Sequence, residues 1–256
     1  MPNKTPNFAT FILKTLMNLC LDIGNTRTKG GFFEDEKMVE KFTVENGNFS
    51  TQFHSLTNRN IQKVIFSTTA NLPETISGFL KMQLSAIELT PHTPVPVKVL
   101  YGTPDTLGKD RLAAVVGAFS LFGGQDCLVA DAGTCITYDW LDRQTNYLGG
   151  NIAPGLEMRL KAMHHFTAKL PLVAAGEIEN PIGKTTETAL RNGALWGALQ
   201  EMEGYIRWGR RHFGKLTVVL TGGNADFFAK NMKRKIFVHP DLVLVGLNKI
   251  LNFNAA

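Results

Sequence analysis

The sequence predicts an α/β protein built from two related halves. Short apolar segments typical of strands alternate along the chain with segments whose apolar residues recur at helical spacing. The motif D-x-G-x-x-x-T occurs twice, at residues 22–28 and 131–137, each time between two strand-like segments. Because self-similarity of this kind marks a structural repeat, we expect two duplicated domains that face each other.

Size and composition agree with a folded protein of one large or two small domains. The 256 residues are 44% hydrophobic and 19% charged, which excludes a disordered or collagen-like chain. The net charge of +5 is spread along the chain, so it is compatible with an anionic ligand such as a nucleotide but gives little support for nucleic-acid binding. No apolar stretch reaches the roughly 18 residues of a membrane span. We therefore expect neither a nucleic-acid partner nor a membrane partner.

The three cysteines, Cys20, Cys127 and Cys135, form no C-x-x-C pair. This argues against a disulfide framework or a zinc site and indicates a reducing, cytoplasmic location. The segment 8–23 is interrupted by Lys14 and Asp22 and lacks a clear cleavage site, so it does not resemble a signal peptide. Because Met17 begins the first strand-like segment, we interpret residues 1–16 as an N-terminal extension that arises from the choice of start site.

The elements of the first half follow from apolar patterning and turn residues. We expect strands at 18–23, 28–34, 37–44, 63–67 and 95–100, and helices at 49–58, 72–83 and 109–122. The last helix carries Leu112, Val115, Val116 and Phe119 at helical spacing and ends at the stop signal 123–124, Gly-Gly. We place the domain boundary there, which gives an N-terminal domain over 17–123 and a C-terminal domain over 124–256.

The second half repeats the pattern. Strands are expected at 127–130, 135–141, 145–152, 216–221 and 235–238, and helices at 154–165, 185–212, 224–231 and 241–252. Each half therefore begins with a strand that ends in an aspartate and a glycine turn.

These two turns have the chemistry of a phosphate site. A glycine two residues after Asp22 or Asp131 allows a tight turn and a close approach of the backbone to a ligand. The Asn and Thr residues that follow, Asn25, Thr26 and Thr134, supply donors to phosphate oxygens. The aspartates are suited to hold hydrated Mg²⁺ or another cation that neutralises those oxygens. The alternative is a pair of ordinary Asp-Gly turns in β-hairpins.

A third glycine turn follows the strand that ends at Thr221. The sequence Gly222-Gly223-Asn224 between a strand and a helix is suited to a nucleoside or a phosphate at the helix N-terminus. The alternative is a plain helix start capped by Asn224. The turn matches neither a Walker A loop nor a Rossmann G-x-G-x-x-G motif.

One further polar cluster lies at residues 101–111, in a Gly/Pro loop that enters the helix at 109–122. Here Asp110 is a candidate base for an alcohol, and Arg111 is a candidate ligand for an anionic group. Alternatively, the two residues complement the helix dipole and form a surface ion pair.

The ordered set of motifs resembles the type III pantothenate kinases over about residues 17–250. The motifs are Asp22-x-Gly24-Asn25-Thr26-x-x-Lys29, Tyr101 with Gly108-x-Asp110-Arg111, Asp131-x-Gly133-Thr134-x-x-Thr137-x-Asp139, Gly149-Gly150-x-Ile152-x-Pro154-Gly155, Thr186 and Thr221-Gly222-Gly223. The resemblance implies two RNase H-like domains of the actin-like ATPase (acetate and sugar kinase) superfamily around a central cleft. It also implies a homodimer that phosphorylates pantothenate with ATP to 4'-phosphopantothenate, the first step of coenzyme A biosynthesis.

The resemblance also implies roles for individual residues. ATP would contact Asp22, Ile23, Gly24, Asn25, Thr26, Arg27, Thr28, Lys29 and Thr134. Pantothenate would lie against Tyr101, Gly108, Lys109, Asp110, Arg111 and Thr186, with Asp110 as the general base. Asp131 would hold a monovalent cation, K⁺ or NH₄⁺, beside the Mg²⁺ that accompanies ATP. The Lys184-Thr185 pair departs from the Arg-Asn expected before Thr186, which weakens that one assignment.

Two other readings remain open: a catalytically inactive relative that acts as a transcription accessory factor, and an actin-like kinase for another small hydroxylated substrate. Several conspicuous residues are expected to be uninvolved. His164 and His165 are adjacent and cannot share a helical face as metal ligands, so we expect surface histidines. Trp196 and Trp208 are expected in the core or at an interface.

Overall fold

The computed structural model describes residues 16–24, 27–46, 59–69, 78, 80, 85–178 and 180–255. Asn25 and Thr26, the helix expected at 49–58 and all but the last residue of the expected extension 1–16 lie outside the described residues. Of the helix expected at 72–83, residues 78 and 80 are described, both helical.

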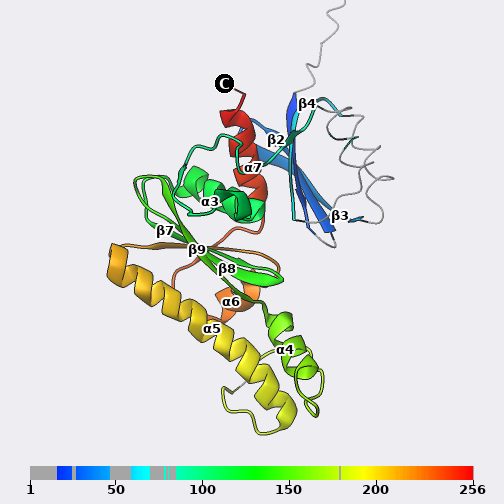
Figure 1. Cartoon of the computed structure of the whole chain (residues 1–256), viewed down its shortest axis with the longest axis vertical. Helices are drawn as coiled ribbons and strands as arrows, with labels where there is room; N and C mark the ends of the chain where they lie inside the picture. Colours follow the sequence, from blue (N-terminus) through cyan, green and yellow to red (C-terminus); the bar gives the residue numbers. More distant parts are fainter. Residues whose placement is uncertain are drawn as a thin grey trace, which may run out of the picture.

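Two β-sheets form the framework, and they repeat the same topology (Figure 1). The first sheet has the order β3-β2-β1-β4-β5, from β1 (Met17–Ile23), β2 (Arg27–Glu34), β3 (Lys37–Glu45), β4 (Ile61–Thr68) and β5 (Ile87–Glu88). The second has the order β11-β10-β7-β8-β9-β6, from β6 (Lys98–Val99), β7 (Cys127–Ala132), β8 (Cys135–Leu141), β9 (Asn146–Pro154), β10 (Thr217–Thr221) and β11 (Phe237–Val238). Read from β9 to β11, the second sheet has the strand order of the first. In both, three antiparallel strands are followed by a parallel pairing.

The repeat extends to individual positions. Asp22 of β1 lies opposite Ser67 of the parallel strand β4, and Asp131 of β7 lies opposite Thr221 of the parallel strand β10. Both aspartates are thus the next-to-last residue of an interior strand of their sheet, opposite a hydroxyl residue. The predicted α/β class and its internal duplication are confirmed.

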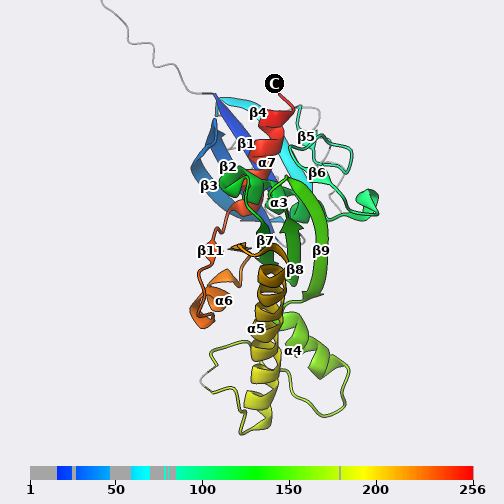
Figure 2. The same cartoon turned by 90° about the vertical axis from the view of Figure 1, so that its left-hand side faces the viewer.

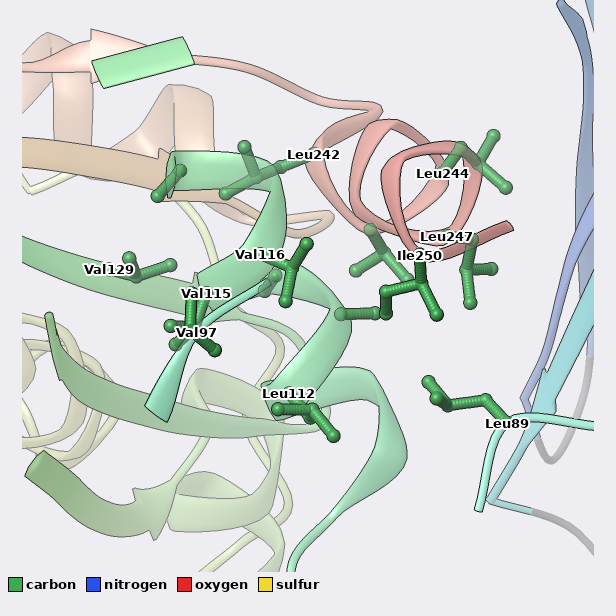
Figure 3. Packing of buried hydrophobic residues seen from close by; sticks show 14 of the residues in the cluster. Leu89, Val97, Leu112, Val115, Val116, Val129, Leu242, Leu244, Leu247 and Ile250 are labelled. Atoms are coloured by element: carbon green, nitrogen blue, oxygen red, sulfur yellow. The ribbon is translucent and has the colours of Figure 1, made fainter. Parts of the chain in front are cut away.

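Two helices fill the space between the sheets, and each packs on the sheet of the other half. The helix α3 (Lys109–Phe122) lies on β7 and β8, whereas α7 (Leu242–Phe253) lies on β1 and β4, and the two helices pack along each other. Figure 3 shows Val116 of α3 facing Ile250 of α7, and both belong to one buried apolar cluster that also contains Leu112 and Leu247. The elements β6 and α3 precede residue 123 in the chain, yet both pack on the second sheet. Residues from before the expected boundary therefore contribute to both sheets, and the boundary at 123 stays a prediction.

Three further helices cover the other face of the second sheet: α4 (Leu156–His165), α5 (Thr186–Phe213) and α6 (Ala225–Asn231). Alternation along β7 explains the two faces, because Cys127 and Val129 join the α3–α7 cluster while Leu128 and Ala130 pack with the apolar residues of α5. The helix α5 begins with a capping box between Thr185 and Thr188. Its first turns lie at the end of the molecule that is farthest from the first sheet (Figures 1 and 2).

Predicted and observed elements agree closely in the second half and in α3, and the differences are short elements. The strand expected at 95–100 is reduced to Lys98–Val99. The two-residue strand β5 and the 3-10 helix η2 (Pro104–Thr106) are too short to show periodicity, and the sequence did not predict them. Among the described residues, no helix is long and apolar enough to cross a membrane.

Candidate active site

The first strand-end carboxylate, Asp22, lies in a half-buried position where β1 ends. Ser67 Oγ donates a hydrogen bond of 3.0 Å to Asp22 Oδ1. Lys29 of β2 lies opposite Asp22 in the antiparallel ladder. Burial raises the pKa of Asp22, and the nearby carboxylate of Asp110 raises it further, while the Ser67 hydrogen bond and Lys29 lower it. Asp22 therefore interacts electrostatically with Asp110, which lies 88 positions away in the first turn of α3.

The second strand-end carboxylate, Asp131, is more strongly perturbed. Burial and, to a smaller extent, the carboxylates of Asp110 and Asp22 raise the pKa of Asp131 to about 7. Lys29 lowers it and Asp139 contributes a smaller rise. Three carboxylates from β1, α3 and β7 thus converge at one place, where like charges repel. Perturbed carboxylates that lie together beside a cleft mark a candidate functional site, although no group of three acidic, histidine or cysteine side chains among the described residues is placed to hold one metal ion.

The turn after β10 closes over Asp131. Gly222 has φ +92, and a Cβ atom on it would lie 2.4 Å from Asp131 Oδ1. This position therefore requires glycine both for its backbone conformation and for the space above the carboxylate. The backbone N–H of Asn224 donates to the carbonyl oxygen of Ala132, at 2.9 Å. The second and third glycine turns of the sequence thus form one continuous wall.

A cleft of about 790 Å³ opens beside this wall. Its lining includes Lys29 from the first sheet together with Gly133, Thr134, Gly223 and Asn224 from the two joined turns. The three glycine turns of the sequence therefore did point to neighbouring parts of one region. Of the residues expected to contact ATP, Lys29 and Thr134 line the cleft.

One face of α4 forms the rest of the cleft lining, and the sequence reasoning missed it. Its residues are Glu157, Met158, Lys161, Ala162 and His165, followed by Phe166. The i, i+4 spacing of Glu157, Lys161 and His165 places them on one side of the helix. His164 and His165 are both exposed, as expected, but His165 also lines the cleft. The sequence feature that could have indicated this face is the i, i+4 series of Glu157, Lys161 and His165, directly after the Pro-Gly turn at 154–155.

Ile23 and Thr28, which flank the first turn, are buried and support its backbone. Ile23 is buried in the apolar core of the first sheet. The hydroxyl of Thr28, which is fully buried, donates to Asn46 Oδ1 at 2.9 Å, and Asn46 Nδ2 donates to the carbonyl oxygen of Gly24 at 2.7 Å. The turn itself is closed by a bond of 3.0 Å from the Gly24 N–H to the Arg27 carbonyl oxygen. The side chains of Ile23 and Thr28 thus support the backbone of the turn, and the side chain of Arg27 is exposed.

The cluster 101–111 forms a second wall around the start of α3. Gly108 is the N-cap residue of α3, and Asp110 Oδ1 accepts a hydrogen bond of 2.8 Å from the backbone N–H of Arg111. Lys109 Nζ lies 3.1 Å from Glu88 Oε1. The ring of Tyr101 lies 5.5 Å from the guanidinium carbon of Arg111. The structure therefore brings Tyr101 and residues 108–111 together.

Arg111 is deeply buried, which rules out the surface ion pair considered from the sequence. Its Nη2 lies 2.6 Å from Oδ1 of Asp139, and the two side chains are 5% and 1% exposed. Burial alone would lower the pKa of Arg111, but its hydrogen bonds and ion pair with Asp139 hold the pKa above the usual value.

Thr186 is the one expected pantothenate residue that the chain does not bring near Asp110. It is the exposed first residue of α5, and this end of α5 extends beyond the second sheet on the side away from α3 (Figures 1 and 2).

Comparison with known proteins agrees with this geometry. A family model described as type III pantothenate kinase matches residues 18–208. A type III pantothenate kinase from Bacteroides fragilis is 46% identical over 93% of this chain and 98% of its own length, and one from Phocaeicola vulgatus is 45% identical over 93% and 99%.

Solved structures show the same fold. A Campylobacter jejuni protein described as a Baf family transcriptional activator has a TM-score of 0.60 at 24% identity, covering 93% of this chain and 98% of that one. The polyphosphate/ATP-glucomannokinase from an Arthrobacter strain has a TM-score of 0.51 at 17% identity, covering 93% and 99%. At these identities the likeness establishes the fold alone, which is that of the actin-like ATPases and sugar kinases.

Proposed function

The chain belongs to the type III pantothenate kinase family, and from this premise we propose how its residues carry out the reaction. The enzyme transfers a phosphoryl group from ATP to pantothenate, the first step of coenzyme A biosynthesis. The observation that carries the proposal is the convergence of Asp22, Asp110 and Asp131 from two sheets and a helix, next to the cleft. Two of these carboxylates serve the phosphate side of the reaction and one serves the alcohol.

Asp110 is the proposed general base. The transition state of phosphoryl transfer is loose, so a kinase gains most from positioning its reactants and from stabilising charge. A carboxylate at the start of α3 accepts the proton of the pantothenate hydroxyl and aligns its oxygen with the γ-phosphorus. Asp110 suits this role because it belongs to the wall formed by residues 101–111 and also interacts with Asp131 and Asp22 beside the cleft.

The cleft is the proposed ATP site. Lys29 and Thr134 line it and would contact phosphate oxygens, and Asp22, Ile23, Gly24, Asn25, Thr26, Arg27 and Thr28 would form or support the first phosphate turn. Lys161 and His165 add positive charge along α4. We place the nucleoside part of ATP between α4 and the turn at Gly223 and Asn224, because these elements form the remaining walls of the cleft.

The strand-end carboxylates fit bound cations. Asp131 is half-buried beside two other carboxylates, and Gly222 has no Cβ atom to press on its Oδ1 atom. A cation favours the ionised form of such a carboxylate and removes the repulsion that phosphate would otherwise meet. We therefore propose Asp131 as the ligand of a monovalent cation, K⁺ or NH₄⁺, and Asp22 as the residue that faces the hydrated Mg²⁺ of the nucleotide. Their contribution is to neutralise charge on the triphosphate.

Pantothenate would lie against Tyr101, Gly108, Lys109, Asp110 and Arg111, next to Asp110 as base. Thr186 belongs to this pocket by resemblance, and its place on α5 makes it the weakest member of the set.

We further propose a homodimer in the cytoplasm. The helix α5 presents Trp196 and Trp208 to the surface, 40% and 52% exposed. Exposed tryptophans on one long helix are typical of an interface. Cys20, Cys127 and Cys135 are free thiols, in keeping with a reducing compartment.

A direct assay tests the function. The purified protein is incubated with ATP, Mg²⁺, K⁺ and pantothenate, and 4'-phosphopantothenate is measured by mass spectrometry together with ADP release. The proposal predicts stoichiometric formation of both products. ADP release that does not depend on pantothenate, or faster turnover of another alcohol in a substrate panel, would identify a different kinase. A protein that binds ATP and pantothenate without turnover would support the regulatory reading.

A further inference from the structure

A buried ion pair joins the start of α3 to the second sheet. Asp139 of β8 accepts hydrogen bonds from Arg111 Nε, at 3.1 Å to Oδ1 and 3.2 Å to Oδ2, and from Arg111 Nη2, at 2.6 Å to Oδ1. Tyr147 of β9 donates its hydroxyl to the same Oδ1 atom, at 2.6 Å. The carboxylate is therefore fixed from two directions, by a helix on one side and a neighbouring strand on the other.

The aromatic neighbours hold the guanidinium on its remaining face. The ring of Tyr101 stacks on that of Tyr147, with centroids 6.4 Å apart and an interplanar angle of 15°. Arg111 lies over the ring of Tyr101. Arg111, Asp139 and Tyr147 are 5%, 1% and 0% exposed. Together these contacts leave the Arg111 side chain with one well-defined orientation.

Such a pair is a poor way to stabilise a fold. The free energy needed to remove both charges from water can exceed the free energy gained from their attraction, and an apolar pair of the same volume often gives a fold of equal stability. A buried, fully hydrogen-bonded pair does, however, fix geometry. Because Asp110 and Arg111 are neighbours in the first turn of α3, fixing the Arg111 side chain also fixes the position of Asp110.

The other end of the pair lies on the hairpin that carries Asp131. Asp131 lies opposite Thr137 in the β7–β8 ladder, and Asp139 follows Thr137 by two residues on the same strand. Residues two apart on a strand point to the same face. The ion pair thus connects the first turn of α3 to the β7–β8 hairpin, which also carries Asp131.

We propose that Asp139 is a positioning residue of the kinase: through Arg111 it fixes the first turn of α3 so that Asp110 is held in register with Asp131 and the phosphate turn. This inference rests on the function proposed above. Asp139 itself touches neither substrate. Arg111 Nη1 is the guanidinium nitrogen that Asp139 does not use, and its direction is set by the same contacts.

The test compares two matched variants of the full-length protein. Asp139→Asn keeps the shape and one acceptor oxygen but removes the charge. Asp126→Asn is the control, because Asp126 is a 5% exposed carboxylate that accepts bonds of 2.9 and 2.5 Å from Arg143 Nε and Nη2, outside the wall and the cleft described above. For each variant, kcat, the KM values for both substrates and Tm are measured.

Asp139→Asn is expected to lower kcat/KM for pantothenate by about tenfold or more, the size of coupling seen between residues of one network. The KM for ATP should change by less than about threefold, since the ATP cleft is formed by other residues. Asp126→Asn should lower Tm and leave kcat/KM within about twofold of wild type. Tyr147→Phe, which removes one hydrogen bond to Asp139, should cause a smaller loss in the same direction and covers the case in which Asp139→Asn fails to fold.

A double-mutant cycle separates positioning from plain loss of stability. If Asp139 acts through Arg111, the loss of kcat/KM caused by Asp139→Asn should be much smaller in an Arg111→Lys background than in wild type. The inference is overturned if folded Asp139→Asn and Tyr147→Phe retain wild-type kcat/KM, or if the losses from the two sites simply add. Absence of pantothenate phosphorylation by the wild-type protein would instead overturn the proposed function, so the two failures are distinguishable.

Discussion

Gly246 of α7 lies directly against the backbone of Ala113 in α3. A Cβ atom on Gly246 would lie 1.8 Å from the carbonyl oxygen of Ala113, and one on Gly117 would lie 2.3 Å from the carbonyl oxygen of Leu242. At these two glycines the backbones of the helices therefore come into direct contact. Because α3 packs on the second sheet and α7 on the first, this crossing holds the two halves of the molecule together.

The first prediction concerns this crossing. Gly246→Ala should lower the free energy of unfolding by about 1–3 kcal/mol, because the added methyl group forces the helices apart. Gly193 is the matched control, since it lies in α5 with open space around its Cβ position. Gly193→Ala should raise the free energy of unfolding by about 0.5–1 kcal/mol, the usual gain of alanine over glycine within a helix. Urea denaturation of both variants provides the measurement, and equal stabilities would show that the crossing is not tightly packed.

The sequence predicted the local elements of the fold but not this exchange of helices. Helix α3 has the predicted bounds because its apolar spacing and its Gly-Gly stop are local signals. Nothing local indicates that α3 leaves the sheet of its own half, or that β6 joins β9. Such pairings depend on packing between residues far apart in the chain, which periodicity does not encode.

The same contrast holds for the site. The turns at Asp22, Asp131 and Gly222 stood out because aspartate and glycine follow predicted strands. Asp139 belongs to the motif set of the resemblance, but its pairing with Arg111 was not predicted, because from the sequence alone it is one polar residue in an alternating strand. The α4 face was missed because it consists of ordinary exposed residues, and the cleft beside it exists only in the folded chain.

The second prediction concerns that face. Lys161→Ala should raise the KM for ATP about five- to tenfold, the effect of losing about 1–1.4 kcal/mol of charge-assisted binding, with little change in kcat. Lys233, an exposed lysine that does not line the cleft, is the control. Steady-state kinetics at saturating pantothenate measure both. An unchanged KM for ATP in Lys161→Ala would remove α4 from the nucleotide site.

The third prediction concerns the monovalent cation. If Asp131 is the proposed ligand, activity should be low in Na⁺ and restored by K⁺ or NH₄⁺, because K⁺ sheds its hydration shell more readily than Na⁺ and Asp131 is a half-buried carboxylate. Asp131→Ala should lose this response. Initial rates in matched chloride salts at constant ionic strength test the claim, and equal rates of the wild-type enzyme in Na⁺ and K⁺ would refute the role of Asp131.

The fourth prediction concerns assembly. Light scattering at micromolar concentration should give the mass of a dimer. Trp196→Glu should shift the mass toward that of a monomer, because a charge would be buried in the interface. Phe253→Glu serves as the control, since Phe253 is 49% exposed at the end of α7, away from α5. A monomeric wild-type protein would disprove the dimer, and a dimer that survives Trp196→Glu would move the interface away from this part of α5.

The fifth prediction concerns the base itself. Asp110→Asn keeps the shape of the side chain and its position at the start of α3 but cannot accept a proton. If Asp110 merely complements the helix dipole, its loss should cost about 0.3–1 kcal/mol of stability and leave the rate unchanged. If it is the base, the rate should fall while the fold and ATP binding persist.

The role of Asp110 as general base is therefore decided by measuring kcat and Tm on one sample of Asp110→Asn, with pantothenate, ATP, Mg²⁺ and K⁺ at saturation. We expect kcat to fall by about 10²–10⁴, the usual effect of removing a general base, with Tm close to that of wild type. A stable variant with wild-type kcat would contradict this role.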